Sequence, residues 1–470
     1  MTEHETQAAA VVLAAGHGVR MRSDLPKVAH VANGRPLLGH VLAALDPVPA
    51  LTRKVIVTSG RPEIERAVAR EVSAGGISFA TQQPARGTAD AVRVGLDELA
   101  LDDGTVLVTY GDTPLMRTET FEAMLRAHGA NRAAATVLVA RVSDPTGYGR
   151  VVRAPDGTIE RVVEERDATD SERAIDEINA GTYVFSARAL RAALGRIDSG
   201  NAQGELYLTD VVGELRSAGA VVAAVEAAEA DVAGVNSRAE LAEAAAELRR
   251  RACARWMSEG VTIVDPATTY IESSVTIGRD ATIHPFTFLE GDTALGERAE
   301  IGPHARVVDS EIGPEAVVTF AVVVGTRLEA GTGVGPFASL RGGTVLEQGA
   351  RAGTFVELKK TRVGPNSKVP HLSYMGDATI GRAVNVGAGS ITCNYDGERK
   401  HETHLEDDVF IGSDTMMVAP VRVGRGAATG AGAVVRDDVP AGALAVGVPA
   451  RVLEGRARPR RGPEGPEATA

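Results

Sequence analysis

Two glycines and two cationic side chains follow the first apolar run of the chain. The run at 9–14 leads directly into Gly16 and Gly18, with Arg20 and Lys27 close behind. Glycines let main-chain N–H groups approach an anion, and the N-terminus of a following helix adds partial positive charge. The pattern favours a phosphate-bearing ligand, although Gly-x-Gly after a strand is also typical of a simple strand-to-helix turn.

Carboxylates and amides stand where later apolar runs of the same region end. Asp112 follows the run at 106–108, and Glu164, Asn179 and Asn236 occupy comparable positions. Taken one by one, such residues are more often turn or cap residues than ligands. Opposite a phosphate loop, however, a carboxylate oxygen is well suited to Mg²⁺. We therefore interpret Asp112 as a Mg²⁺ ligand.

A second polar group lies in the C-terminal half, where His371 is flanked along the chain by Arg341, Lys359 and Lys400. Histidine can act as a general base near neutral pH, whereas Arg and Lys can bind a phosphate group. These residue types suit a base-catalysed reaction on a phosphorylated substrate. A lone histidine is nevertheless more often a surface or core residue, so the residue types alone do not decide.

Apolar runs and amphipathic stretches alternate through the first half of the chain, and these elements must position the first polar group. Apolar runs at 55–57, 77–79 and 106–108 alternate with helical patterns that begin near Glu63 and Thr88. This alternation predicts a doubly wound, Rossmann-like α/β domain, in which ligands bind at the carboxyl ends of the strands.

An aliphatic residue at every sixth position organises the second half. A six-residue period fits neither an α-helix nor an alternating strand, which argues against a β-sandwich. It predicts a parallel β-helix whose aliphatic residues fill a three-sided prism. We expect the glycine that often follows the aliphatic residue to relieve strain at a tight corner. The repeat is clearest at Ile277, Ile283, Leu289, Leu295, Ile301 and Val307.

A helical stretch joins the two patterns. Ser237 and Glu240 form a capping-box pattern, and the Ala-rich segment after them has helical spacing. The C-terminal tail is rich in Pro, Gly, Arg and Glu, which is typical of disorder. The sequence thus predicts a doubly wound α/β domain (1–236), a linker helix (237–258), the β-helix (259–454) and a disordered tail (455–470).

Composition narrows the class of protein. With 470 residues the chain is long enough for more than one core, and its formal net charge of −12 argues against a nucleic-acid partner. Cys253 and Cys393 are the two cysteines, too few and too far apart for a disulfide framework or a cysteine-rich metal site. The apolar run at 8–15 is too short to span a bilayer. We expect a soluble, cytoplasmic protein without a membrane partner.

Several short motifs occur in an order that resembles one enzyme family. They are Leu-Ala-Ala-Gly-x-Gly-x-Arg-Met, Leu-Pro-Lys, Gly-Thr, Tyr-Gly-Asp, Gly-Tyr-Gly-Arg, Val-Glu, Asn-x-Gly and Gly-Val-Asn. Over nearly its whole length the chain resembles the bifunctional N-acetylglucosamine-1-phosphate uridylyltransferases and glucosamine-1-phosphate acetyltransferases. The resemblance implies a left-handed β-helix, a homotrimer formed through it, and synthesis of the cell-wall precursor UDP-N-acetylglucosamine from glucosamine 1-phosphate, acetyl-CoA and UTP with Mg²⁺.

The resemblance implies roles for residues of the N-terminal half. It implies that Asp112 and Asn236 bind Mg²⁺, and that Arg20 and Lys27 face the phosphates. Val19 departs from the family pattern, which usually has threonine there, so we expect a detail of phosphate contact to change while the activity remains. Gly147, Glu164 and Asn179 are implied to hold the N-acetylated sugar. The other residues implied to bind UTP or the UDP-sugar are Leu13, Ala14, Ala15, Gly16, Gln82, Gly87, Thr88, Tyr110, Gly111 and Asn236.

For the C-terminal half, the resemblance implies that His371 is the catalytic base and that Glu357 supports the site. Cys393 is interpreted as a packing residue. The last coil, 444–451, departs from the family pattern, so no terminal residue is assigned to coenzyme A. The residues implied to bind glucosamine 1-phosphate are Arg341, Lys359, Tyr374, Asn385 and Lys400, and those implied to line an acetyl-CoA groove are Ala388, Asn394, Tyr395, Ser413 and Ala431.

Three other interpretations fit parts of the sequence. A single-activity sugar-1-phosphate nucleotidyltransferase with a structural or regulatory β-helix leaves the polar residues from His371 to Lys400 unexplained. A β-helix metal hydrolase lacks an obvious three-ligand arrangement, and the third alternative is a purely structural trimer.

The segment 394–400 interrupts the repeat and should project from its own prism. We therefore predict that His371 of one chain works with Lys400 of another.

Overall fold

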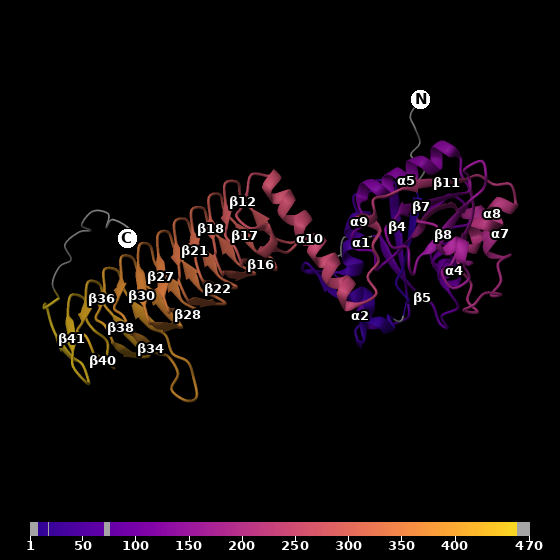
Figure 1. The fold of residues 1–470 in the computed structure, drawn as a ribbon. Helices are drawn as coiled ribbons and strands as arrows, with labels where there is room; N and C mark the ends of the chain where they lie inside the picture. Colours follow the sequence, from indigo (N-terminus) through magenta and orange to yellow (C-terminus); the bar gives the residue numbers. More distant parts are fainter. Residues whose placement is uncertain (1–7, 17, 70–75, 458–470) are drawn as a thin grey trace, which may run out of the picture. The chain divides into compact units, whose positions relative to one another are not determined.

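The computed structural model describes residues 8–16, 18–69 and 76–457, and the chain divides into two compact units after Leu248. The division falls inside α10 (Arg238–Ser258), the helix predicted between the two halves (Figure 1). The predicted capping box closes the start of this helix. The Glu240 N–H donates to Ser237 Oγ (3.3 Å), and the Ser237 N–H donates to the Glu240 carboxylate (2.9 Å).

The first unit is built on a nine-stranded mixed sheet. Its central path runs through β11 (Val222–Glu226), β7 (Ala135–Arg141), β10 (Glu177–Ser186), β6 (Thr105–Tyr110), β1 (Ala8–Leu13), β4 (Leu51–Thr58) and β5 (Ile77–Thr81). The strands β6, β1, β4 and β5 are parallel, as the alternating pattern predicts, whereas β10 runs antiparallel to β6 and β7. The hairpin of β8 (Gly149–Arg153) and β9 (Ile159–Val163) extends from β10.

Helices cover both faces of this sheet, because alternate residues of its buried strands point to opposite sides. Val11 and Val57 pack with residues of α4, whereas Val12 and Ile56 pack with residues of α1 and α5. The helices of the unit are α1 (Leu37–Leu45), α2 (Pro62–Ala67), α4 (Thr88–Glu98), α5 (Thr118–Asn131), α6 (Asp170–Arg173), α7 (Ala187–Leu194), α8 (Asp210–Ser217) and α9 (Glu229–Val232), with η1 (Val19–Met21), η2 (Lys27–Ala29) and the small hairpin β2 (Val31–Ala32)–β3 (Arg35–Pro36) between them.

The second unit is a left-handed parallel β-helix with three faces, each a ladder of every third strand (Figure 1). Face 1 contains β12 (Thr262–Ile263), β15 (Thr282–Ile283), β18 (Glu300–Ile301), β21 (Val317–Val318), β24 (Gly333–Val334), β27 (Arg351–Thr354), β30 (Lys368–His371), β33 (Asn385–Val386), β36 (Phe410–Ile411), β39 (Ala428–Thr429), β41 (Leu444–Val446) and β42 (Arg451–Leu453). Face 2 contains β13 (Tyr270–Ile271), β16 (Phe288–Glu290), β19 (Arg306–Val308), β22 (Ala321–Val324), β25 (Ala338–Arg341), β28 (Glu357–Lys359), β31 (Tyr374–Gly376), β34 (Ile391–Cys393), β37 (Met416–Val418) and β40 (Val434–Val435). Face 3 contains β14 (Thr276–Ile277), β17 (Ala294–Leu295), β20 (Glu311–Ile312), β23 (Arg327–Leu328), β26 (Val345–Leu346), β29 (Arg362–Val363), β32 (Ala378–Ile380), β35 (Thr403–Leu405) and β38 (Val421–Val423).

The six-residue period corresponds to one step around this prism, as predicted. Ile277, Ile283 and Leu289 are all buried, and they lie on faces 3, 1 and 2 in turn. One full coil later, Ile283 pairs in parallel with Ile301. The aliphatic positions therefore fill the interior, and each coil covers the apolar edge of the one before it.

The expected role of the glycines holds at some coils and is wrong at others. Gly302 (φ 98°) and Gly335 (φ 103°) follow an aliphatic residue and have the positive φ that favours glycine at a corner. A Cβ on Gly296 would lie 2.5 Å from the main-chain nitrogen of Pro314 in the next coil, and one on Gly313 would lie 2.7 Å from the carbonyl carbon of Glu329. There the corner residues with positive φ are instead non-glycine residues such as Arg298 (φ 57°) and Glu315 (φ 59°). Gly296 and Gly313 are thus required by the close approach of successive coils and not by corner strain.

The end of the prism is marked by β42, which pairs antiparallel with β41. Of the tail predicted to be disordered, residues 455–457 are described, and the Ala457 N–H donates to the carbonyl of Gly442 (3.1 Å). Residues 458–470 lie outside the described residues. Within the described part of the chain, no helix is both long enough and apolar enough to cross a membrane.

Candidate functional site

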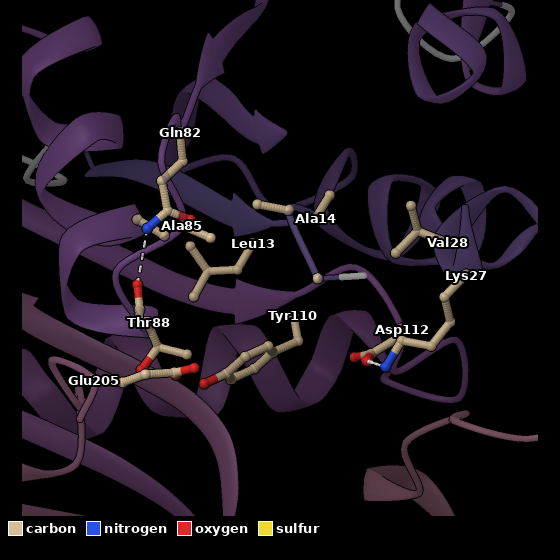
Figure 2. A pocket seen from close by; sticks show the side chains of 14 residues that line it. Leu13, Ala14, Lys27, Val28, Gln82, Ala85, Thr88, Tyr110, Asp112 and Glu205 are labelled. Atoms are coloured by element: carbon tan, nitrogen blue, oxygen red, sulfur yellow. Dashed lines mark hydrogen bonds and ion pairs between the residues drawn. The ribbon is translucent and has the colours of Figure 1, made fainter. Parts of the chain in front are cut away.

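The first unit contains a cavity of about 300 Å³ at the carboxyl ends of β1 and β6 (Figure 2). This is the edge of the sheet at which a doubly wound fold places its ligand. Its size suits a small-molecule ligand. It is lined by Leu13, Ala14, Ala15, Gly16, Lys27, Val28, Gln82, Ala85, Gly87, Thr88, Ala91, Tyr110, Asp112 and Glu205. Ten of these lining residues were predicted from the sequence; Val28, Ala85, Ala91 and Glu205 were not.

The main chain forms one wall of this cavity. The Gly111 N–H donates to the Leu13 carbonyl (2.9 Å), which ties the end of β6 to the end of β1. A Cβ on Gly16 would meet no atom within 4 Å, so its backbone borders open space. Gly18 has φ 60°, and a Cβ there would lie 2.7 Å from Lys27 Cβ. The loop thus presents bare main chain next to a lysine, as a phosphate site requires. Val19, the position at which the family pattern usually has threonine, is 84% exposed.

The two predicted metal ligands converge on one cationic group. Lys27 Nζ donates to Asn236 Oδ1 (2.8 Å) and forms an ion pair with Asp112. The Val235 N–H donates to the Asp112 carbonyl (2.9 Å), which holds the two segments together. A carboxylate oxygen and an amide oxygen gathered around a positive charge are a suitable partial ligand set for a hard divalent cation that also binds phosphate and water.

Polar side chains at the other end of the cavity are held by internal hydrogen bonds. Gln82 is 4% exposed, and its amide nitrogen donates to the Gly87 carbonyl and to Asp90 Oδ2, both at 3.0 Å. The Leu208 N–H donates to Thr88 Oγ1 (3.0 Å). Burial, followed by the nearby Glu164 charge, raises the pKa of Tyr110, so its phenol stays neutral at physiological pH.

A second hollow of about 350 Å³ contains other predicted residues. Arg20, Gly147 and Asn236 line it together with Tyr148 and acidic residues of α10. Asn236 therefore borders this hollow while its side chain contacts Lys27 in the first. The predicted phosphate, sugar and metal residues are accordingly neighbours, although the sequence separates them widely.

Glu164 and Asn179 lie close together on the hairpin side of the sheet. A Cβ on Gly149 would be 3.6 Å from Asn179 Cβ and 3.6 Å from Glu164 Oε2. Burial raises the pKa of Glu164, whose Oε1 accepts from Thr209 Oγ1 (3.0 Å). Asn179 donates to the Tyr183 hydroxyl (2.6 Å) and accepts from the Gly181 N–H (3.2 Å).

One residue that was not predicted as a site residue links these segments. Arg150 is 2% exposed and donates to the Tyr148 carbonyl, and its guanidinium lies 2.7 Å from the Glu165 carboxylate. It thereby connects the turn that carries Gly147 with the loop that carries Glu164. Arg150 is the arginine of the Gly-Tyr-Gly-Arg motif, but nothing in the spacing of that motif shows that this arginine is buried.

In the second unit, the predicted phosphate-binding cations lie along one edge of face 2. Arg341 and Lys359 are register partners on β25 and β28. Arg341 Nη1 donates to Glu357 Oε1 (3.0 Å), and Glu357 is in turn the register partner of Tyr374. The ammonium of Lys359 lies beside that of Lys400 and lowers its pKa, because two like charges repel. An anion would relieve this repulsion.

His371 and Asn385 occupy a different part of the prism. His371 is exposed at the end of β30 on face 1, where the chain turns into face 2, and Asn385 lies on the next strand of face 1. Tyr374 begins the strand of face 2 that follows His371, whereas Lys359 ends its strand at the far edge. A single chain thus brings Arg341, Lys359 and Lys400 together but places His371 and Asn385 apart from them.

The insertion after β34 projects from the prism, as predicted (Figure 1). Its base is closed by an antiparallel bridge between Tyr395 and Lys400, and Asp396 accepts from the Arg399 N–H (2.7 Å) and from His401 (2.6 Å). Asn394, predicted to contact acetyl-CoA, is 7% exposed and donates to Asp377 Oδ2 (2.6 Å).

The other predicted acetyl-CoA residues recur at one position of successive coils. Ala388, Ser413 and Ala431 each follow a glycine at the end of a face 1 strand. They form a row of small side chains beside the corner that leads from His371. Cys393 is half-buried, and burial raises the pKa of its thiol, which fits the packing role predicted for it.

Among the described residues, no group of three or more His, Cys, Asp or Glu side chains could hold a metal ion.

Comparison with known proteins identifies the family. Residues 9–248 match the nucleotidyl transferase family. The bifunctional protein GlmU of Corynebacterium efficiens is 47% identical over 465 residues, which cover 98% of this chain and 96% of that protein. Its counterparts from Streptomyces avermitilis and Rhodococcus opacus are 49% and 50% identical, over 93% and 94% of this chain and 91% and 89% of theirs. The chain therefore belongs to the bifunctional GlmU family.

Proposed function

We propose that this enzyme makes UDP-N-acetylglucosamine in two steps, acetylation of glucosamine 1-phosphate by acetyl-CoA in the β-helix and uridylyl transfer from UTP in the first unit. The observation that carries the proposal is the joining of Lys27, Asp112 and Asn236 at the mouth of a cavity with a phosphate-loop wall. It occurs in a chain that matches bifunctional relatives over nearly their whole length.

In the uridylyl step, a phosphate oxygen of N-acetylglucosamine 1-phosphate attacks the α-phosphorus of UTP. One P–O bond forms, the bond to the β-phosphate breaks, and pyrophosphate leaves. Lys27 and Arg20 balance negative charge on the phosphates, and the bare main chain at Gly16 can donate to them. Asp112 and Asn236 would hold Mg²⁺, which neutralises charge on the phosphates when bound. Glu164 and Asn179 would orient the sugar.

In the acetyl step, the amine of glucosamine 1-phosphate attacks the thioester carbonyl. A C–N bond forms, the C–S bond breaks, and coenzyme A leaves as its thiol. His371 accepts the proton that the amine loses and can return it to the departing thiolate. Arg341, Lys359 and Lys400 would bind the sugar phosphate, since they gather at one edge of face 2. The row of Ala388, Ser413 and Ala431 leaves room for the acetyl donor.

The acetyl site is proposed to be completed by other chains of a homotrimer. His371 is exposed. The preceding coils carry Phe337 and Phe355 at a corner of the prism, where their rings stack with centroids 5.2 Å apart and each residue is 56% exposed. Leu372, beside His371, is 62% exposed. Exposed apolar surface of this kind marks an interface. A neighbouring prism packed on it would bury these side chains and bring a Lys400 toward His371.

One assay tests the proposed function against its alternatives. Pyrophosphate release and free-thiol release are measured with glucosamine 1-phosphate and with N-acetylglucosamine 1-phosphate. We expect thiol release only with the first substrate and pyrophosphate release chiefly with the second. Pyrophosphate without thiol release would indicate a single-activity nucleotidyltransferase, and neither product would indicate a structural trimer.

A further inference from the structure

The amide of Gln82 is held in one orientation. Its nitrogen lies 3.0 Å from the Gly87 carbonyl oxygen and 3.0 Å from Asp90 Oδ2, and Figure 2 shows the first of these bonds. A carbonyl and a carboxylate can only accept hydrogen bonds, so the group that faces both must be the NH₂. Both amide hydrogens are therefore used inside the protein. What remains for a ligand is the acceptor Oε1.

The carboxylate that holds this amide is itself fixed. Asp90 lies in the first turn of α4, is 5% exposed and does not line the cavity. Its other oxygen forms an ion pair with Arg93, whose side chain is 50% exposed. The backbone of Gln82 is anchored too, because its N–H donates to the Thr58 carbonyl (2.8 Å). The direction of the Gln82 amide is thus set jointly by the Gly87 carbonyl and by a buried carboxylate behind the cavity wall.

We propose that Asp90 is a positioning residue that sets the base specificity of the nucleotide cavity by leaving Gln82 only an acceptor to present. This inference rests on the proposed use of UTP. Uracil carries an N–H donor between its two carbonyls, whereas cytosine has an unprotonated nitrogen, an acceptor, at the same ring position. An acceptor opposite that position pairs with uracil and repels cytosine, and a buried mispaired polar group is costly.

The test is the ratio of kcat/KM for UTP to that for CTP, measured by pyrophosphate release. In Asp90→Asn, Arg93 has only donors to offer and so retains the amide oxygen. The new NH₂ then faces the Gln82 NH₂, so only the Gly87 carbonyl still supports the original orientation and the reversed amide can compete with it. We expect the ratio to fall by about tenfold or more, the worth of one mispaired hydrogen bond. Asp90→Ala, which leaves that side of the amide unpartnered, should lower the ratio by less.

Two controls separate positioning from a general structural effect. Arg93→Gln removes the ion pair but keeps the carboxylate, so the ratio should stay at the wild-type value. In a Gln82→Ala background, Asp90→Asn should change the ratio no further, because the coupled partner is gone. Circular dichroism of the same preparations follows the helices of the first unit and reports whether each variant is folded.

The outcomes distinguish this inference from the proposed function. Wild-type chain that releases no pyrophosphate from UTP contradicts the proposed function. Active wild-type chain with unchanged ratios in Asp90→Asn and Asp90→Ala overturns the Asp90 inference alone. An equal fall of the ratio with and without Gln82 overturns it as well.

Discussion

The two units hold their polar residues in opposite ways. In the first unit, Gln82, Asn179 and Arg150 are almost fully buried, and each is bonded to a partner from the surrounding fold. In the prism, Arg341, His371 and Lys400 are exposed, and the repeat places neighbouring side chains one coil apart. A doubly wound domain wraps loops around a cavity, whereas a solenoid contacts only its neighbouring coils.

This difference bears on how each site excludes water. The first unit encloses its cavity with residues of a single chain. A prism arranges side chains in straight ladders but offers a nearly flat surface, so a second surface must cover it before charges and a base can act in a dry environment. The first site should therefore depend on one chain and the second on contact between chains.

The strongest test of their separation is Asp112→Ala. Loss of this carboxylate leaves Lys27 without its ion-pair partner and removes one of the two oxygen ligands proposed for Mg²⁺. We expect uridylyl transfer to fall by at least about 10²–10³-fold, and acetyl transfer to remain near wild type, because distant sites act independently. Asp102→Ala, at a surface aspartate that is 90% exposed, is the matched control. Parallel loss of both activities in folded protein would contradict the two-site account.

The reciprocal change is His371→Ala. Removal of a positioned base should lower thiol release by about 10²–10⁴-fold and spare uridylyl transfer from ready-made N-acetylglucosamine 1-phosphate. His404→Ala provides the control, because His404 is a partly exposed histidine of the prism that lies on face 3 beside Glu402. Wild-type acetyl transfer by His371→Ala across neutral and mildly acidic pH would assign this histidine a structural role.

A smaller effect concerns stability and sharpens the contrast between crowded and open surfaces. Burial, followed by repulsion from Asp167, raises the pKa of Asp210 to about 6. The folded state then binds more protons than the unfolded state between about pH 4 and 6, so stability falls as pH rises through that window. Because Asp210 is half-exposed and water screens its charge, Asp210→Asn should raise the free energy of unfolding by only about 1 kcal/mol above pH 6, and it should change nothing below pH 4.

Circular dichroism of the helices can follow this transition, since nearly all helices lie in the first unit. Asp103→Asn, also in the first unit, removes the carboxylate from an exposed ion pair with Arg188 (2.7 Å) and should give no measurable change at any pH. A pH-independent effect of Asp210→Asn would show that the raised pKa does not govern stability.

Periodic and edge-located features could be predicted from the sequence. The six-residue repeat predicts that Ile277, Ile283 and Leu289 lie in the core, because each repeat corresponds to one step from face to face around the prism. Asp112 and the loop at Gly16 could be paired because parallel strands end at one edge of a sheet. The position of Asp112 and Gly16 at the same edge follows from the order of strands and helices along the chain alone.

Features that depend on distant contacts could not be predicted. Thr209 donates to Glu164 across 45 residues, and Arg150 is buried by partners on other loops. The role of Gly296 depends on its distance to the next coil, which the local pattern does not contain. The antiparallel course of β10 also has no local signal, since its apolar pattern is that of any buried strand.

The central claim is that one chain builds the first site and that neighbouring chains share the second. Its most direct test mixes chains that carry different lesions. His371→Ala and Lys400→Ala chains are co-expressed with two affinity tags, and mixed oligomers are purified and assayed for thiol release. Asp112→Ala and Lys27→Ala chains are mixed in the same way and assayed for pyrophosphate release. The account predicts partial recovery of acetyl transfer in the first mixture, because some interfaces pair an intact His371 with an intact Lys400, and no recovery of uridylyl transfer in the second. Thiol release no higher than that of the two parents would contradict it.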